Sequence, residues 1–178
     1  MNLANKLTLA RIFLVPIFLM VIAHRDVPYA DYLAAAVFIL AASTDGLDGY
    51  IARTRNQVTR LGKFMDPLAD KLLVSAALVS LVEMGRLSAW VAVIIIGREF
   101  AVTGLRAIIA GDGVVVAASK LGKYKTVAQI VAIVALFIRA FPPVLNNTLM
   151  GLAVILTIWS GADYFRKNKH LLKAGANK

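Results

Sequence analysis

The chain has 178 residues and a formal net charge of +10, from 20 Lys and Arg against 10 Asp and Glu, yet 60% of its residues are hydrophobic. Only 17% of the residues are charged, whereas an ordinary soluble domain has about 25%. This composition excludes a disordered chain and argues against a soluble nucleic-acid-binding domain, so no nucleic-acid partner is expected. The sequence contains no cysteine, which excludes disulfides and thiolate metal sites. Its length fits a single domain over residues 1–178.

The apolar residues form six blocks, each close to the roughly 20 residues that a helix needs to cross a bilayer. Gly, Pro, Asn and charged residues fill the breaks between them and favour turns. The sequence therefore predicts an all-α, multi-pass bundle of six transmembrane helices. The first block could also be a cleavable signal peptide, but its polar residues would have no use in one. The predicted spans are 7–23, 32–53, 62–82, 87–109, 119–140 and 148–165.

The Lys and Arg residues are distributed unevenly between the two sides of these spans. With the N-terminus in the cytoplasm, all of them except Arg25, Arg86 and Arg139 lie at or toward the cytoplasmic side. Because positively charged loops stay in the cytoplasm, this distribution predicts that both termini are cytoplasmic. Arg98 and Arg106 carry less weight in this argument, since they lie within a span.

Four aspartates stand inside the second and third predicted spans. If all four faced lipid they would cost roughly 10–14 kcal/mol, at about 2.5–3.5 kcal/mol each. Asp45 and Asp48 are i,i+3 neighbours, and Asp66 and Asp70 are i,i+4 neighbours, so each pair shares one helix face. A short connection makes the two helices antiparallel neighbours, which lets the pairs face each other. Four carboxylates in this arrangement suit two hard divalent cations, Mg²⁺ or Mn²⁺.

Small residues accompany the aspartates. Gly49, Ala52 and Gly62 leave room for a phosphorylated ligand near the backbone, and Arg53 can contact its phosphate. Structural ion pairing of the aspartates with Arg53, Lys63 and Lys71 is an alternative, but it does not require glycines at these spacings. A cation-coupled carrier is another, because intramembrane carboxylates also line ion pathways. The charges stop at mid-span, however, and leave no polar chain to the opposite face.

This segment resembles the CDP-alcohol phosphotransferase family, whose pattern is D-x2-D-G-x2-A-R-x8-9-G-x3-D-x3-D. The fixed positions are all matched, by Asp45, Asp48, Gly49, Ala52, Arg53, Gly62, Asp66 and Asp70. The resemblance implies six transmembrane helices, a homodimer, and two divalent metals held by the four aspartates, with Asp70 also acting as the general base. It further implies transfer of a phosphatidyl or similar group from a CDP-linked donor to an alcohol, with release of CMP.

Outside this motif, four segments resemble the bacterial members of the family that use sn-glycerol 3-phosphate as the acceptor. These segments are 5–11, 98–106, 122–126 and 160–165. The narrower resemblance implies CDP-diacylglycerol as the donor, phosphatidylglycerophosphate as the product, and a cytoplasm-facing site in the bacterial plasma membrane. Sister enzymes that use inositol phosphate, serine or phosphatidylglycerol are the alternative.

Two further sets of residues are expected to bind the substrates. A phosphorylated acceptor needs a cationic site, for which the candidates are Arg98, Arg106, Lys123 and Lys125. For Arg98 and Arg106 the alternative is an ion pair with Glu99 or anchoring at the cytoplasmic side. For Lys123 and Lys125 it is such anchoring, because basic residues cluster at cytoplasmic helix ends. Asn5 and Thr8 are expected at the donor site, although both could instead cap the first helix. The full set expected to contact the cytidine diphosphate is Asn5, Thr8, Gly49, Ala52, Arg53 and Gly62.

Overall fold

The computed structural model describes the backbone of residues 3–24, 29–54, 60–111, 120–139 and 141–175, and within them all side chains except those of residues 3–5, 45–54, 60–64, 66, 120 and 170–175. The described residues form six α-helices and no β-strand, which confirms the predicted all-α class. The helices are α1 (Leu3–Ala23), α2 (Ala30–Thr54), α3 (Arg60–Glu83), α4 (Ala89–Gly111), α5 (Lys120–Ile138) and α6 (Pro143–Gly175).

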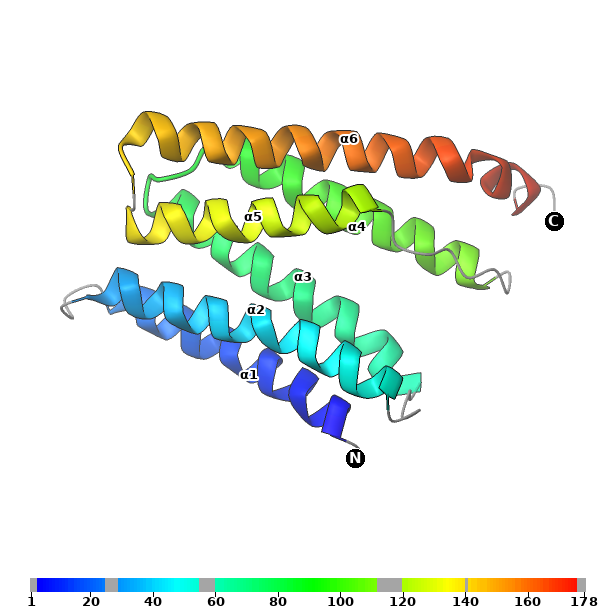
Figure 1. The fold of residues 1–178 in the computed structure, drawn as a ribbon, viewed down its shortest axis with the longest axis horizontal. Coiled ribbons are helices and arrows are strands. Elements are labelled where there is room, and N and C mark those ends of the chain that lie inside the picture. The colour runs from blue at the N-terminus through cyan, green and yellow to red at the C-terminus, as the bar shows by residue number, and fades with distance from the viewer. Residues whose placement is uncertain (1–2, 25–28, 55–59, 112–119, 140, 176–178) are drawn as a thin grey trace.

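Successive helices run in opposite directions, so both chain termini lie at one end of the bundle (Figure 1). This end is called the terminal end below. The helices α1, α2 and α3 pack against one another, α4 packs against α3 and α6, and α5 packs against α2 and α6. In Figure 1, α3 crosses the bundle diagonally between the group formed by α1 and α2 and the group formed by α4, α5 and α6.

Helix α6 differs most from its predicted span, which covered only 148–165 and treated the prolines and asparagines at 142–147 as a break. The helix begins at Pro143, because the first helical position needs no backbone N–H and favours proline. Asn146 donates its side-chain amide to the carbonyl of Phe141 at 2.8 Å and is buried. At its other end α6 continues past the apolar block to Gly175, through a basic segment.

The hydrophobic core contains residues from all six helices. Phe18 of α1 is fully buried at its centre and contacts Phe38 of α2 and Phe137 of α5, with ring centroids 6.1 and 5.6 Å away. Small buried residues let helix backbones approach one another closely, as is typical of membrane bundles. Each of the other five helices contributes at least one of them to this core, including Ala34, Ala77, Ala92, Ala132 and Ala153.

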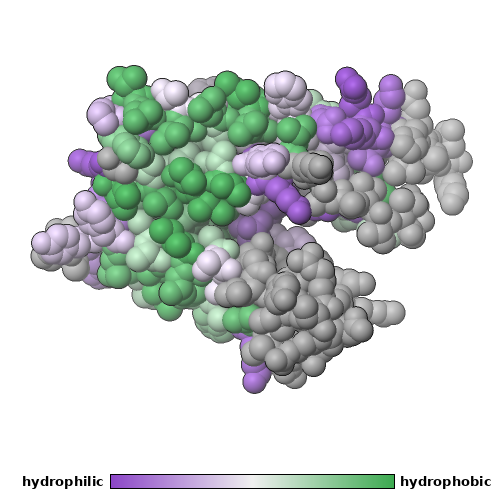
Figure 2. Space-filling model, viewed as in Figure 1, coloured by the Kyte–Doolittle hydropathy of each residue, from purple (hydrophilic) through white to green (hydrophobic). Residues whose placement is uncertain are grey.

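The outer surface is also apolar over much of its area. Figure 2 shows hydrophobic side chains over the middle of the visible face and hydrophilic ones toward the terminal end. Among the described residues, three helical segments are long and apolar enough to cross a membrane, namely Lys6–Ala23, Leu121–Ile138 and Pro143–Lys169. In α4, Arg98, Glu99 and Arg106 interrupt the apolar sequence. Six membrane spans therefore remain a prediction, although all six helices are present.

The turn between α3 and α4 lies at the end of the bundle opposite the termini and links neighbouring helices there. Helix α3 ends in a Schellman motif, in which Gly85 has a φ of 66° and the N–H of Arg86 bonds to the carbonyl of Leu81 at 2.9 Å. Arg86 then pairs with Asp31 of α2 at 2.6 Å and donates to the carbonyl of Phe137 in α5 at 2.8 Å. One side chain thus joins the ends of three helices.

Candidate active site

A pocket of about 440 Å³ lies among α3, α4, α5 and α6. Its volume is in the range of about 300–1,000 Å³ that small-molecule sites occupy. The lining comes mainly from the C-terminal half of α4 and the first turns of α5, which lie toward the terminal end (Figure 1). We refer to it as the basic pocket, because its described cationic side chains outnumber its single carboxylate, Glu99. These cations are Lys71, Arg98, Arg106, Lys123 and Lys125.

The four residues expected to bind an acceptor phosphate therefore line one pocket, although they come from two different helices. Arg106 and Lys123 are exposed, whereas Lys125 is only 4% exposed. The ion pair between Arg98 and Glu99, which was the alternative role for Arg98, is present as well, with 3.1 Å between Nη1 and Oε1. Both roles are compatible, because a guanidinium has five N–H donors and this pair uses one.

Glu99 stands at the centre of the charges in this pocket. Its Oε1 accepts from Arg98 and from Lys125 Nζ, and its Oε2 lies 2.8 Å from Lys71 Nζ. Glu99 is 6% exposed, so these three cations replace most of the water that its carboxylate would otherwise bind. One buried carboxylate thereby holds cations from α3, α4 and α5 together.

Arg98 is held from the side of α6 as well. Its Nη2 donates to Ser160 Oγ at 2.8 Å, and Ser160 is buried. The next residue, Gly161, leaves the space that this side chain occupies: a Cβ at Gly161 would lie 3.0 Å from Arg98 Cγ and 3.3 Å from Nε. The absence of a side chain at Gly161 is therefore a condition for the observed position of Arg98.

Tyr164 closes the same pocket one turn further along α6. The guanidinium carbon of Arg106 lies 6.0 Å from the centre of its ring, at the outer limit of a cation–π contact. Tyr164 is 6% exposed and packs with Val102, Leu105 and Ile109 of α4 in a small apolar cluster. Val102 and Tyr164 of this cluster line the pocket and form an apolar wall beside the cations.

Asp70, the predicted general base, is next to the basic pocket. Its Oδ2 lies 2.8 Å from Lys71 Nζ, the same ammonium that binds Glu99 Oε2 at 2.8 Å. The Asp70 side chain is 30% exposed, so it is accessible to a ligand. Lys71 therefore connects the predicted base directly to the centre of the pocket.

The rest of the aspartate motif occupies the ends of two packed helices. Residues 45–54 form the last turns of α2 and residues 60–70 the first turns of α3, as the spacing predicted. The described side chains include Asp70 but not the other metal and donor candidates of this segment, so their mutual arrangement stays a prediction. The residues concerned are Asp45, Asp48, Gly49, Ala52, Arg53, Gly62 and Asp66.

The two donor candidates on α1 lie near its N-terminus. Thr8 is 1% exposed, while the side chain of Asn5 is outside the described ones. Three residues after Thr8, Arg11 is fully buried and donates Nε to the carbonyl of Ala41 at 3.3 Å and to Thr44 Oγ1 at 3.2 Å. Arg11 thus binds α1 to the turn of α2 that precedes the aspartate motif, a structural role beyond its predicted contribution to topology.

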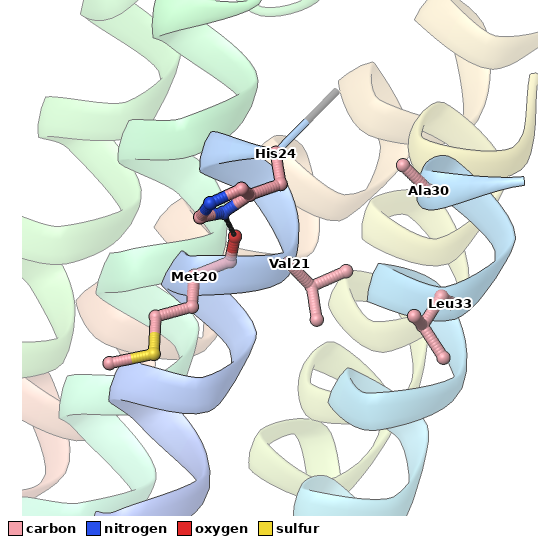
Figure 3. Close-up of a pocket in the computed structure, with 5 residues that line it drawn as sticks. All are labelled: Met20, Val21, His24, Ala30 and Leu33. Carbon is pink, nitrogen blue, oxygen red and sulfur yellow. Dashed lines mark hydrogen bonds between the residues drawn. The ribbon is translucent and has the colours of Figure 1, made fainter. Parts of the chain in front are cut away.

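A second pocket, of about 230 Å³, lies between α1 and α2 at the end opposite the termini (Figure 3). Val21 and Leu33 point into the space between the two helices, and His24 bonds through Nδ1 to the carbonyl of Met20 at 2.9 Å. Apart from His24 its lining is apolar. It lacks the cations that a phosphorylated substrate would need, so the basic pocket is the better candidate.

Comparison with known proteins decides the family. The sequence profile of the CDP-alcohol phosphatidyltransferase family matches residues 1–159. The chain belongs to this family. Membership confirms the resemblance inferred from the motif and favours a transferase over a cation-coupled carrier. Together with the three long apolar helices, it identifies the chain as a membrane protein.

Similar proteins match this transferase over almost its whole length. A CDP-diacylglycerol–glycerol-3-phosphate 3-phosphatidyltransferase of Bacillus subtilis is 48% identical over 97% of both chains. A protein of the same name from Rickettsia bellii is 37% identical over 94% of this chain and 96% of its own. A probable phosphatidylglycerophosphate synthase of Mycobacterium tuberculosis is 41% identical over 92% of this chain and 79% of its own.

Two residues that line the basic pocket were not among those predicted to bind a ligand. Lys71 and Glu99 were considered only as ion-pair partners, yet both line the basic pocket. A signal for Glu99 was present in the sequence, since a glutamate between two arginines of an apolar helix needs partners. Which cations serve as those partners depends on helix packing, which local spacing does not determine.

Proposed function

We propose that this transferase moves the phosphatidyl group of CDP-diacylglycerol to sn-glycerol 3-phosphate, giving phosphatidylglycerophosphate and CMP in phospholipid biosynthesis. The single observation that carries the proposal is the basic pocket beside Asp70, where cations converge next to the predicted base. The names of the relatives specify the same donor and acceptor for those proteins.

The acceptor phosphate would bind Arg98, Arg106, Lys123 and Lys125. Arginine offers a bidentate fork to phosphate oxygens and lysine a point charge, so the set suits a dianionic group. Lys71 adds a cation on the side of Asp70. A phosphate held here would keep the acceptor's hydroxyl near Asp70 because the glycerol backbone between them is short.

The aspartate motif fits two divalent cations, Mg²⁺ or Mn²⁺. Its donors are carboxylates, which suit hard cations, and the two helices that carry it pack against each other. Bound cations would neutralise the donor pyrophosphate and stabilise charge on the entering and leaving oxygens. The residues that would hold them are Asp45, Asp48, Asp66 and Asp70.

Asp70 would take the proton of the attacking hydroxyl. The acceptor oxygen then forms a bond to the phosphatidyl phosphorus as the bond between that phosphorus and the CMP oxygen breaks. The donor's acyl chains would stay in the bilayer, with its head group in the site. Contacts to the cytidine diphosphate would come from Asn5, Thr8, Gly49, Ala52, Arg53 and Gly62.

The proposed setting is the plasma membrane of a bacterial cell. The excess of Lys and Arg at the terminal end orients both termini and the basic pocket toward the cytoplasm, where glycerol 3-phosphate is found. Six membrane spans and a homodimer are part of the proposal, following the family resemblance. Cross-linking in native membranes tests the dimer, and labelling of substituted cysteines tests the orientation of each end.

Acceptor choice provides the direct test of this function. Purified protein in detergent with CDP-diacylglycerol and Mg²⁺ should release CMP when sn-glycerol 3-phosphate is added. It should release little with inositol phosphate, serine or phosphatidylglycerol. Release should stop with a chelator and return with Mg²⁺ or Mn²⁺. A higher rate with one of the other acceptors would contradict the proposed substrate, and chelator-resistant turnover would contradict the metal site.

Gly161 gives a test of how Arg98 is positioned. The substitution Gly161→Ala places a Cβ 3.0 Å from Arg98 Cγ, so the stem of Arg98 must shift by a few tenths of an ångström. We expect the KM for glycerol 3-phosphate to rise about 3- to 10-fold, a loss of about one hydrogen bond. The KM for CDP-diacylglycerol should change less.

The control for this test is on the same helix. Gly151→Ala makes the identical chemical change where nothing lies within 4 Å of the new Cβ. This variant should keep both KM values. Equal KM values for Gly161→Ala and the wild type would show that the position of Arg98 does not matter for acceptor binding.

A further inference from the structure

Glu99 is the only carboxylate among the described residues that line the basic pocket. It is 6% exposed and contacts Lys71, Arg98 and Lys125 at once. A buried acid at a site for an anionic ligand is unexpected on charge alone, because it repels the phosphate that the cations attract. Its presence therefore calls for a role that outweighs this repulsion.

The geometry indicates what that role is. Three cations from α3, α4 and α5 would repel one another at this spacing, and long Lys and Arg side chains have many rotamers. A common carboxylate offsets the repulsion and restricts each side chain to one orientation. Lys125 depends on it most, because the lysine is 4% exposed and Glu99 is the only carboxylate that the described structure places within ion-pair distance.

Lys71 extends this arrangement to the reacting end of the site. Its Nζ lies 2.8 Å from Glu99 Oε2 and 2.8 Å from Asp70 Oδ2. Asp70 and Lys71 are on α3, and Glu99 is on α4, so the lysine links the two helices at the edge of the pocket. Glu99 thus has a short, direct connection to the predicted base as well as to the phosphate-binding cations.

We propose that Glu99 is a positioning residue, whose carboxylate fixes Lys71, Arg98 and Lys125 so that the acceptor phosphate binds at a set distance from Asp70. The inference rests on the proposed function and specifies how its acceptor site is built. Glu99 itself does not contact the phosphate. Its net effect on acceptor binding is favourable, because the order it imposes on three cations outweighs the repulsion from one negative charge.

The test compares Glu99→Gln, which removes the charge at nearly constant size, with Glu99→Asp, which keeps the charge on a shorter side chain. Glu99→Gln should raise the KM for glycerol 3-phosphate about tenfold or more, the effect of losing a hydrogen bond to a charged group. The KM for CDP-diacylglycerol should stay within about twofold, and Glu99→Asp should recover part of the loss. Glu83→Gln, the same change at the exposed far end of α3, should match the wild type.

A role in folding alone would lower the amount of active enzyme and leave both KM values unchanged. Unchanged KM values for Glu99→Gln would therefore overturn the inference. A lower KM for glycerol 3-phosphate would overturn it as well, because it would show that Glu99 only competes with the phosphate. If Glu99→Gln is not recovered as a folded protein, Glu99→Asp must still show the selective rise in the KM for glycerol 3-phosphate, and an unchanged value contradicts the inference.

A binding measurement separates this inference from the proposed function. Inorganic phosphate added without donor or metal should raise the unfolding temperature of the wild-type protein, and should do so much less for Glu99→Gln. If the wild type releases no CMP with glycerol 3-phosphate, the proposed function is wrong, and the phosphate shift still decides the role of Glu99. Equal phosphate shifts in the two proteins would overturn the positioning role alone.

Discussion

Replacing Asp70 with asparagine is expected to lower CMP release by about 10³-fold or more. A general base contributes typically about 10²–10⁴-fold, and this residue is also a predicted metal ligand. The amide has nearly the shape of the carboxylate, but it neither accepts the hydroxyl proton nor carries the charge that pairs with Lys71 at 2.8 Å. Turnover measured with saturating CDP-diacylglycerol, glycerol 3-phosphate and Mg²⁺ checks the prediction.

A matched control for Asp70→Asn is available on α6. Asp163 pairs with Lys167 at 2.7 Å, one helical turn away, and has no proposed part in the reaction. Asp163→Asn should keep CMP release within about twofold of the wild type, because a surface ion pair of this kind contributes little. A general base typically contributes about 10²–10⁴-fold to the rate. If Asp70→Asn retains more than about a tenth of the wild-type rate, the loss is too small for a base, and the assignment of Asp70 as the base is wrong.

The second large effect is expected at Lys125. Lys125→Met keeps the length and the apolar stem of the side chain but removes its ammonium from the basic pocket. We expect the KM for glycerol 3-phosphate to rise about 10- to 100-fold, since a hydrogen bond to a charged group is worth about 1.5–3 kcal/mol. Glu99 keeps two of its cations, Lys71 and Arg98, so the pocket should still form. Initial rates at varied glycerol 3-phosphate concentration give the KM.

Lys167→Met is the corresponding control. It makes the same change at a side chain that is 65% exposed and pairs only with Asp163 among the described acids. This variant should leave both KM values unchanged. An unchanged KM for glycerol 3-phosphate in Lys125→Met would place the acceptor phosphate elsewhere, and a parallel rise in the KM for CDP-diacylglycerol would indicate a general loss of structure.

Local sequence alone predicted only some of the charged residues that line the basic pocket. Arg106, Lys123 and their neighbours were selected by residue type and by resemblance, and the structure places them around one space. The same selection omitted Lys71 and gave Glu99 only a competing role. Both residues are positioned in the pocket by ion pairs with residues on other helices. Residue type alone does not predict which helices pack together.

The start of α6 was also not predictable from local sequence. The prolines and asparagines before residue 148 predicted a break, and the chain instead starts its last helix at Pro143. Local signals for a helix start and for a turn use the same residues, so the tertiary structure decides between them. The extension does not alter the proposed site, which uses α6 at Ser160, Gly161 and Tyr164.

The sequence by itself determined the all-α class, the six helices and the family. A chain this apolar must satisfy its backbone hydrogen bonds within each segment, which favours long helices, and the eight matched positions of the aspartate motif are local in sequence. Only the tertiary structure decided which charges neutralise one another. Glu99 contacts Lys71 and Lys125, and Arg98 contacts Ser160, across separations of 26 residues or more. Such contacts depend on how helices pack, and this packing makes one pocket of residues from α3, α4, α5 and α6.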